Sequence, residues 1–324
     1  MVARVVNVNP STYAPSPLHA PDRNWHEGNC YTDLWIAVLH CLGLEPRACL
    51  GSTLSCSYSA DQWTFFKPAL TDLYHLYGVV TEEMTVWRSV LAHCETHIAA
   101  GQLPLVEVDA FYLPDTAQTD YQQQHTKTTI AVNAVDANAQ TLEYFHNAGY
   151  FELTGTDFDG IFRLSEKTGV NYLPPYCETV KLSQLIKRPD TELKLLAREM
   201  AAKHCKSKPL GNAMTAFAQS LEQTVPQLIE HDEDYFHAWV FASLRQLGAG
   251  FELAAIHLRW LADEKEIGIH DAAHHFEAVA DTAKMLVMKT ARIAMSGKTK
   301  SLGAPLAQMQ ADLEAAYTLV DRHL

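Results

Sequence analysis

The sequence has few features that assign a chain to a membrane or to the cell exterior. No apolar run reaches the roughly 18–20 residues that a membrane-spanning helix needs. Residues 1–20 lack the basic start and the uninterrupted apolar stretch of a signal peptide. The seven cysteines are an odd number without repeated close spacing, which argues against a secreted disulfide framework. We therefore expect a cytoplasmic protein with reduced thiols and no membrane partner.

Positive charge is also scarce. The chain has 25 lysine and arginine residues against 38 aspartate and glutamate residues, and its formal net charge is −13. A surface of this sign repels phosphate backbones, so we expect no nucleic-acid partner. The glycine-containing turns at residues 51–53 and 248–250 lack a following Lys-Ser or Lys-Thr pair, so neither predicts a phosphate-binding loop.

Apolar residues, by contrast, are plentiful. They make up 48% of the 324 residues, which is ample for one large or two medium-sized domains. Before residue 180, strand-like runs and helical stretches alternate with turns, and after it almost everything has helical periodicity. We predict an α+β domain over residues 1–180, with a central helix against a mostly antiparallel sheet. An all-α domain is predicted over residues 181–324.

The individual elements follow from periodicity and turn signals. In the first domain we expect helices at residues 31–41, 62–77 and 81–99 and strands at residues 105–111, 128–135 and 141–145. Turn-forming residues 136–139 make the last two strands a hairpin, residues 150–153 and 161–164 extend the sheet, and residues 174–180 form the passage between domains. In the second domain we expect helices around residues 191–205, 213–225, 233–247, 249–264, 270–295 and 304–323.

Cys30 is the first candidate for chemistry. It stands where a glycine-containing loop enters the strongly apolar helix expected at residues 31–41. The unpaired N–H groups and the positive end of a helix favour a reactive thiolate there. The backbone N–H of Cys30 is also placed to stabilise an oxyanion that forms on a bound carbonyl. The alternative is a buried structural cysteine, which is the usual role of a free thiol. The other six cysteines lack this context.

A thiolate nucleophile needs a base, and the expected hairpin offers one. His125 stands just before the strand at residues 128–135, and Asn147 just after its partner strand. Antiparallel pairing about the turn puts Asn147 opposite approximately residue 128, close to His125. We expect Asn147 to orient the imidazole and to leave its other nitrogen facing Cys30. His146 faces the opposite side of the strand and is the weaker alternative base.

The order of a cysteine, a histidine about a hundred residues later and an asparagine after the next strand resembles the papain-like cysteine fold. In that fold, a nucleophile at the start of a central helix faces a histidine and an asparagine or aspartate on a sheet. The resemblance implies that Asn24, six residues before Cys30, contributes its amide to the oxyanion hole. On its own, an asparagine in a loop is more often a turn or cap residue.

Within that fold, the chain is similar to the N-terminal domain of the butirosin-biosynthesis acyltransferase. It is more similar to a bacterial family with a Leu-Val-Glu-Val-Asp-like strand before the histidine, here residues 105–109, then residues 111–114 and His125. Its members accompany acyl-carrier proteins and amino-acid–carrier-protein ligases. The resemblance implies transfer of an acyl or aminoacyl group from a carrier's phosphopantetheine thioester, without a cofactor of the enzyme's own. One departure is Thr126-Lys127, where butirosin-type relatives usually have an aromatic or apolar residue directly after the histidine.

Three functions remain open from these observations. The first is a cysteine acyltransferase in which Cys30 is acylated, His125 moves protons and a small-molecule amine or hydroxyl is the acceptor. The second is a papain-like cysteine peptidase or amidase, which the cytoplasmic setting and the large helical domain disfavour. The third is a non-catalytic scaffold, which the complete set of Cys30, His125 and Asn147 disfavours.

Several histidines have spacings seen in metal sites. His93 and His97 are an i, i+4 pair on an expected helix, but the glutamate that follows the first histidine of a zinc protease is absent. Two acid–histidine pairs with i, i+3 spacing, at 234/237 and 274/277, lack the further carboxylates of a di-metal bundle. We expect polar helix faces here and no metal.

An acidic carrier protein needs a local basic surface to approach this acidic chain. From Lys181 to Lys208 there are eight basic residues against three acidic ones, and residues 284–300 hold five basic residues without an acid. A solvated helix face is the alternative explanation for each. We expect the first cluster to dock the carrier, chiefly through Lys187, Arg188 and Lys194.

Overall fold

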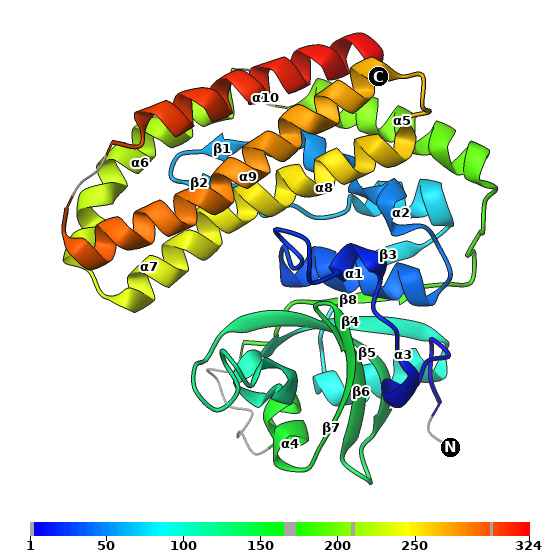
Figure 1. Cartoon of the computed structure of the whole chain (residues 1–324). Coiled ribbons are helices and arrows are strands. Elements are labelled where there is room, and N and C mark those ends of the chain that lie inside the picture. Colours follow the sequence, from blue (N-terminus) through cyan, green and yellow to red (C-terminus); the bar gives the residue numbers. More distant parts are fainter. Residues whose placement is uncertain (1–2, 165–172, 209–210, 299–300) are drawn as a thin grey trace. The chain divides into compact units, whose positions relative to one another are not determined.

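The computed structural model describes residues 3–164, 173–208, 211–298 and 301–324 (Figure 1). Its contacts divide the chain into two compact units. The sheet unit comprises Met1–Ala20, Cys30–Pro46 and Leu73–Lys187, and the helical unit comprises Pro21–Asn29, Arg47–Asp72 and Arg188–Leu324. The expected order of an α+β part followed by an all-helical part is confirmed. The compact units are not continuous in sequence, because Pro21–Asn29 and Arg47–Asp72 pack with the helices.

The sheet unit contains a six-stranded antiparallel sheet with the strand order β3-β8-β4-β5-β6-β7 (Figure 1). The strands are β3 (Val80–Glu83), β4 (Gln102–Asp109), β5 (Lys127–Asp136), β6 (Thr141–His146), β7 (Gly149–Thr154) and β8 (Cys177–Lys181). The expected β5–β6 hairpin is confirmed. The Asp136 carboxylate closes its turn by accepting the N–H groups of Asn138 and Ala139 at 2.9 and 3.0 Å.

The two faces of this sheet are covered by different helices. On one face, Val106 and Ile130 pack with α3 (Val90–Ala99) and α4 (Thr156–Phe162). On the other, the register aligns Leu105 with Glu178 of β8. Tyr31 of α1 (Cys30–Cys41) donates its hydroxyl to Glu178 at 2.7 Å, and α1 also contacts β5 and β6, so α1 covers this second face. All its residues from Tyr31 to Leu39 are buried, as expected of a central helix.

Four expected elements of the first part are corrected. The helix expected from residue 62 begins only as α2 (Leu70–Tyr77), after a small hairpin of β1 (Tyr58–Ser59) and β2 (Gln62–Trp63). The helix expected from residue 81 is preceded by strand β3 and begins only with α3. The strand expected at 161–164 is instead the end of α4 and the turn that follows it, and the expected passage at 174–180 is mostly strand β8. In the β3 and β8 regions, cross-strand pairing with distant residues outweighs local periodicity.

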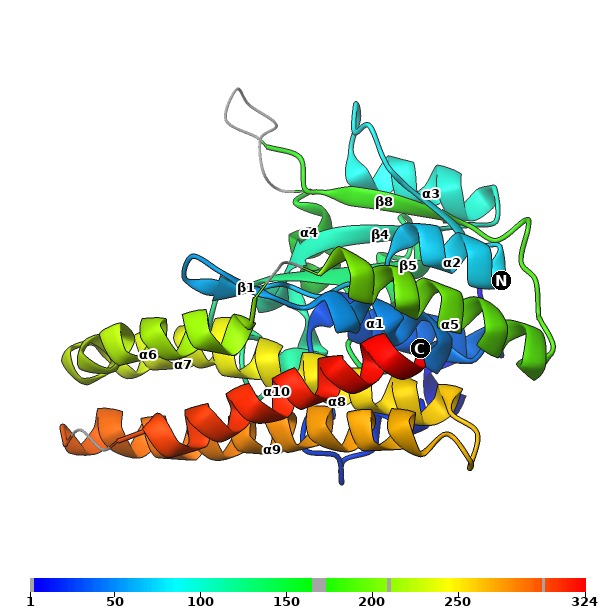
Figure 2. The ribbon, with the colours of Figure 1, turned by 90° about the horizontal axis from the view of Figure 1, so that it is seen from above.

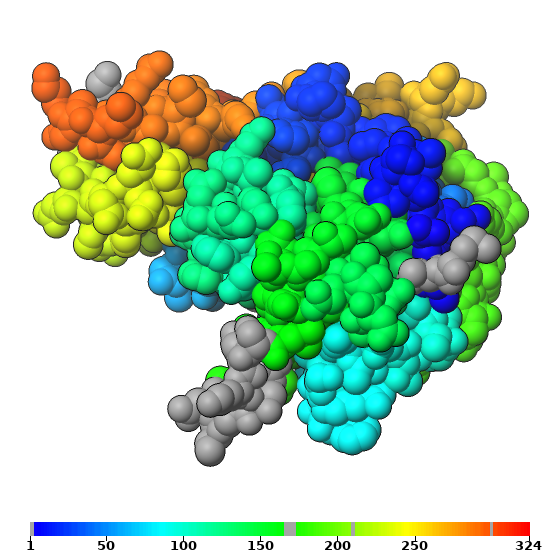
Figure 3. Space-filling model, turned by 90° about the horizontal axis from the view of Figure 1, so that it is seen from below, coloured from blue at the N-terminus to red at the C-terminus, as the bar shows by residue number. Residues whose placement is uncertain are grey.

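The helical unit contains the expected helices of the second part (Figure 2). They are α5 (Asp190–Ser207), α6 (Ala213–Glu230), α7 (Glu233–Val240), α8 (Gln246–Leu261), α9 (Ile267–Ser296) and α10 (Gly303–His323). A π-helical turn at Phe241–Arg245 joins α7 to α8. Outside these six helices, the first part of the chain has 3-10 helices at Pro10–Thr12, Pro17–His19, Pro46–Ser55, Ala110–Tyr112 and Pro114–Thr116. Part of α9 lies at the surface in the space-filling view (Figure 3, orange).

The break expected near residue 248 is absent, because Gly248 has a packing role inside α8. A Cβ atom at Gly248 would lie 2.3 Å from the ring of Trp25, so only glycine lets this ring approach the helix. The Trp25 ring nitrogen donates to the carbonyl of Ala280 at 3.1 Å and ties α8 to α9. None of the described helices is both long and apolar enough to cross a membrane.

Candidate active site

Cys30 is the first residue of α1, which confirms the helix start expected from the sequence. Its side chain is partly exposed, whereas burial raises the pKa of most other thiols. The raised values are about 11 for Cys41 and about 12 for Cys56, Cys177 and Cys205, and the pKa of Cys94 is raised further. Cys30 is therefore more exposed than the four buried thiols among these, and it differs from the equally partly exposed Cys41 by lying at the start of α1 rather than at its end.

His125 pairs with a carboxylate that the sequence interpretation had placed only in a strand. Its Nδ1 lies 2.6 Å from Oδ2 of Asp109, the last residue of β4. The register sets Asp109 opposite Lys127, which brings the segment before β5 alongside the end of β4. Because an ionised carboxylate only accepts hydrogen bonds, Nδ1 is the donor in this contact, and Nε2 is the ring nitrogen that does not face Asp109. The ring stacks on Phe111 with centroids 4.4 Å apart, and the side chain is 69% exposed.

The structure does not bring Asn147 to His125, and this corrects the expected pairing. The register between β5 and β6 is close to the expected one, with Ala131 opposite Phe145, but β6 ends at His146. His125 lies before the first residue of β5 and turns towards β4, whereas Asn147 lies in the turn between β6 and β7. The strand ladder that was expected to join them does not extend that far.

The Asn147 turn also lies towards the wrong end of α1 for a role beside Cys30. Tyr13 donates its hydroxyl to the carbonyl of Ala148 at 2.8 Å, and burial together with the nearby Cys41 thiol raises the pKa of Tyr13. Cys41 is the last residue of the twelve-residue α1, about 16 Å along the helix from Cys30. Asn147 has a φ of 47°, a left-handed conformation that asparagine tolerates, so it serves as a turn residue.

His146, the weaker alternative base, is buried in a polar network on the other face of the sheet. Its Nδ1 lies 2.6 Å from Asp115, and its Nε2 lies 2.7 Å from the hydroxyl of Thr128. Tyr144 donates its hydroxyl to the second oxygen of Asp115. The pKa of Tyr144 is raised mainly by burial and also by this carboxylate. Both ring nitrogens of His146 are thus bonded within the protein, which suits a structural cross-link.

Asn24 belongs to the helical unit, where its amide has a partner. Its Nδ2 donates to Oδ1 of Asp281 at 2.5 Å, and its carbonyl accepts from Nζ of Lys284 at 3.0 Å. Since Cys30 belongs to the sheet unit, the oxyanion role that the resemblance gives Asn24 stays a prediction.

The first turn of α1 and the His125–Asp109 pair share one face of the sheet. Glu178, which accepts the hydroxyl of Tyr31, lies opposite Leu105 of β4. Side chains alternate along a strand, so Glu107 and Asp109 follow Leu105 on that face. The sequence interpretation missed Asp109 because its partner comes from strand register. The available signal was the alternation in residues 105–109, which ends on an acid at the strand's end.

A cavity of about 270 Å³ opens beside this pair. It is lined by Glu107, Val108, Asp109, His125, Thr126, Lys127, Arg163 and Pro175. Lys127 donates to Glu107 at 3.0 Å, so the cavity combines carboxylates, cations and an imidazole in a balanced charge pattern. Its volume is near the lower limit of ligand pockets and suits a small acyl group with one or two polar atoms.

Comparison with family models accounts for most of the chain. Residues 14–182 match the model of the DUF1839 N-terminal domain, and residues 190–322 match that of the DUF1839 C-terminal domain. The chain belongs to the DUF1839 family. The two matched regions meet between the end of β8 and the start of α5, close to the boundary expected from the sequence. No curated protein matches this DUF1839 chain.

The other histidine-rich features of this DUF1839 protein have local partners. Nε2 of His93 accepts the N–H of Trp87 at 3.3 Å, and Nδ1 of His97 lies 2.7 Å from Gln102. His237 pairs with Glu233 at 3.2 Å. Within the described ranges, no three histidine, cysteine or carboxylate side chains gather as metal ligands.

The basic cluster expected to dock a carrier is partly neutralised. Arg188 pairs with Glu192 one helical turn away on α5, and Lys194 lies 3.7 Å from Asp190. These ion pairs reduce the positive potential that the cluster projects, so the docking role of Lys187, Arg188 and Lys194 stays a prediction.

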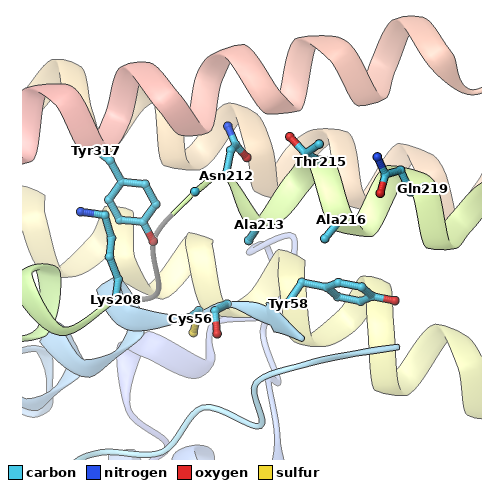
Figure 4. Close-up of a pocket in the computed structure, with 11 residues that line it drawn as sticks. Cys56, Tyr58, Lys208, Asn212, Ala213, Thr215, Ala216, Gln219 and Tyr317 are labelled. Atoms are coloured by element: carbon cyan, nitrogen blue, oxygen red, sulfur yellow. The ribbon is translucent and has the colours of Figure 1, made fainter. Parts of the chain in front are cut away.

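A second cavity, of about 380 Å³, lies in the helical unit (Figure 4). Its prominent polar groups already have partners: Tyr317 donates to the carbonyl of Leu54 at 3.0 Å, and Asn212 donates to that of Gln310 at 3.0 Å. Lys208 lies over the ring of Tyr317 at 4.7 Å. The cavity therefore offers a weaker case for ligand binding than the one beside His125.

Proposed function

We propose that this DUF1839 protein transfers an acyl or aminoacyl group from the phosphopantetheine thioester of a carrier protein to an amine or hydroxyl acceptor. The observation that carries the proposal is the arrangement of the sheet face. The partly exposed thiol of Cys30 begins the buried helix α1, which covers one face of the sheet. The His125–Asp109 pair lies at the edge of the same face, beside a cavity. The resemblance to papain-like acyltransferases supports the same chemistry.

In the first step, Nε2 of His125 takes the proton of the Cys30 thiol, and the resulting thiolate attacks the carbonyl carbon of the thioester. The backbone N–H of Cys30, at the positive end of α1, stabilises the developing oxyanion. The bond from the carbonyl carbon to the pantetheine sulfur then breaks, and the protonated His125 gives its proton to the departing sulfur. The products are free pantetheine thiol and an acyl thioester on Cys30.

In the second step, Nε2 of His125 removes a proton from the acceptor as its nitrogen or oxygen attacks the acyl carbon. The bond to Sγ of Cys30 breaks, and the imidazolium returns its proton to the thiolate. Asp109 holds the Nδ1 proton in both steps and stabilises the imidazolium that forms within each of them. Atoms and charges balance with these groups alone.

Intact-protein mass spectrometry tests the proposal. The protein is incubated with an acyl thioester of free pantetheine, and in parallel with a set of peptides. We expect a mass increase equal to the acyl group, absent in Cys30→Ala and retained in Cys41→Ala, a change at the other end of the same helix. Peptide cleavage without an acyl adduct would instead indicate a peptidase. The absence of both would point to a scaffold.

A further inference from the structure

The C-terminal half of α9 carries a second apolar stripe on its exposed side. Met285, Met288 and Met295 are 40%, 59% and 88% exposed, and with Arg292 they follow i, i+3, i+7, i+10 spacing. We call these four residues the methionine face. Leu286, Thr290 and Ile293 of the same helix are buried in the helical unit. Residues at this spacing share one side of a helix. The methionine face is therefore an apolar stripe that no other helix covers among the described residues.

The charge around the methionine face is positive. Lys284, Lys289 and Lys298 lie along the same stretch as Arg292, and no acidic residue occurs between Asp281 and Asp312. Within the described ranges, no ion pair involves these four cations, whereas the basic side chains at 188, 194 and 198 of the α5 region each pair with an acid. In a chain of net charge −13, this stretch is thus a basic surface that its own acids leave uncompensated.

We infer that the methionine face is the docking surface for an acidic protein that presents apolar side chains on a helix, namely the carrier protein of the proposed reaction. The inference rests on the proposed function for the identity of the partner. Exposed apolar patches mark interaction sites, and methionine adapts its unbranched side chain to a partner's surface. The surrounding cations steer an acidic partner to this patch against the repulsion of the rest of the chain.

Charge argues against a second copy of this chain as the occupant. A symmetric dimer places the same patch on both subunits, so the Arg292 and Lys289 side chains would meet their own copies. Like charges brought together at an interface are unfavourable. An acidic partner satisfies the cations that a second copy would repel.

Binding and kinetics together test this inference. The variant Met288→Glu/Arg292→Glu is compared with the control Lys187→Glu/Arg188→Glu/Lys194→Glu, which reverses charge at the partly ion-paired cluster. Affinity for a fluorescently labelled holo acyl carrier protein is measured by anisotropy, with Cys30→Ala in every protein to prevent turnover. We expect the methionine-face variant to bind at least about tenfold more weakly and the control to change much less.

The same pair of variants, with Cys30 intact, is assayed with an acyl group on the carrier protein and on free pantetheine. The methionine-face variant should raise KM for the carrier substrate by about tenfold and leave the free-pantetheine reaction unchanged. Wild-type KM for the carrier should also rise with salt. Because both positions are exposed, the fold should persist, and circular dichroism with the milder Met288→Gln variant checks this.

Unchanged carrier affinity in Met288→Glu/Arg292→Glu would overturn the docking surface, and so would a larger loss in the control. A wild-type dimer that this variant dissociates would assign the face to a second copy instead. Failure of acylation by free pantetheine thioester would refute the proposed function, and the anisotropy measurement separates that outcome from a failure of docking.

Discussion

One histidine of each unit, His125 in the sheet unit and His257 in the helical unit, shows what distinguishes a candidate reactive imidazole from a structural one. In the sheet unit, His125 is exposed, and one ring nitrogen is held by the carboxylate of Asp109. In the helical unit, His257 is fully buried with Nδ1 2.8 Å from the carbonyl of Arg47, and desolvation lowers its pKa to about 4. The first ring is open to solvent beside a carboxylate, and the second is kept neutral in a core.

Some features of the candidate site follow from local sequence patterns, and others depend on how distant strands pair. The helix start at Cys30 and the β5–β6 hairpin follow from local signals, namely an apolar run after a glycine-containing loop and a turn between two strand-like runs. The His125–Asp109 contact depends on the register between β4 and β5, which no local pattern specifies. The same holds for β8. The sequence predicted a linker there, and the segment is a strand because it pairs with β3 on one side and β4 on the other.

The largest expected effect comes from removing the nucleophile. Cys30→Ala should lower transfer activity by a factor of about a thousand or more, because the covalent route is lost, and Cys30→Ser should behave similarly. His125→Ala should lose nearly as much, since nucleophile and base act as a unit. Steady-state release of free pantetheine thiol measures this. Wild-type turnover in Cys30→Ala would refute the assignment.

The second effect separates the two candidate partners of His125. Asp109→Asn should lower kcat by about a hundredfold or more, because an amide no longer stabilises the imidazolium and can favour the wrong tautomer. Asn147→Ala, in the turn between β6 and β7, is the matched control and should retain most activity. Both are compared by kcat on the same thioester. If Asn147→Ala lost more activity than Asp109→Asn, the result would favour Asn147, as predicted from the sequence, over Asp109 as the partner of His125.

The third effect concerns the buried imidazole of the helical unit. The pKa of His257 lies near 4 in the folded chain and near 6.5 when unfolded, so the unfolded chain binds more protons between these values. Stability should therefore fall as the pH drops from about 6.5 to 4, by about 3 kcal/mol from this group. Urea unfolding at pH 7 to 4.5 measures the slope, which His257→Gln should reduce.

Exposed His237 supplies the control for that slope. His237→Gln should leave the pH dependence of unfolding as it is in the wild type, because the side chain is exposed. An equal reduction in both variants would show that burial of His257 is not the cause.

The smallest expected effect is on thiol alkylation. Near pH 7, thiols with pKa values of about 11 to 12, such as Cys41, Cys56 and Cys205, contain almost no thiolate. Cys30 is partly exposed at a helix N-terminus, so brief treatment with iodoacetamide should label it at least about tenfold faster than these three. Peptide mapping gives the rates. Preferential labelling of a buried thiol, with Cys30 inert, would contradict the activated nucleophile.

The central claim, an acyl group carried on Cys30, is tested most directly by isolating that intermediate and discharging it. The protein is acylated with an acyl-pantetheine thioester, freed of excess substrate, mapped by peptide mass spectrometry and then exposed to an amine acceptor. We predict an acyl adduct on the peptide that contains Cys30, and the loss of this adduct as an equal amount of acylated amine forms. An adduct on another cysteine, or one on Cys30 that persists in the presence of the amine, would contradict it.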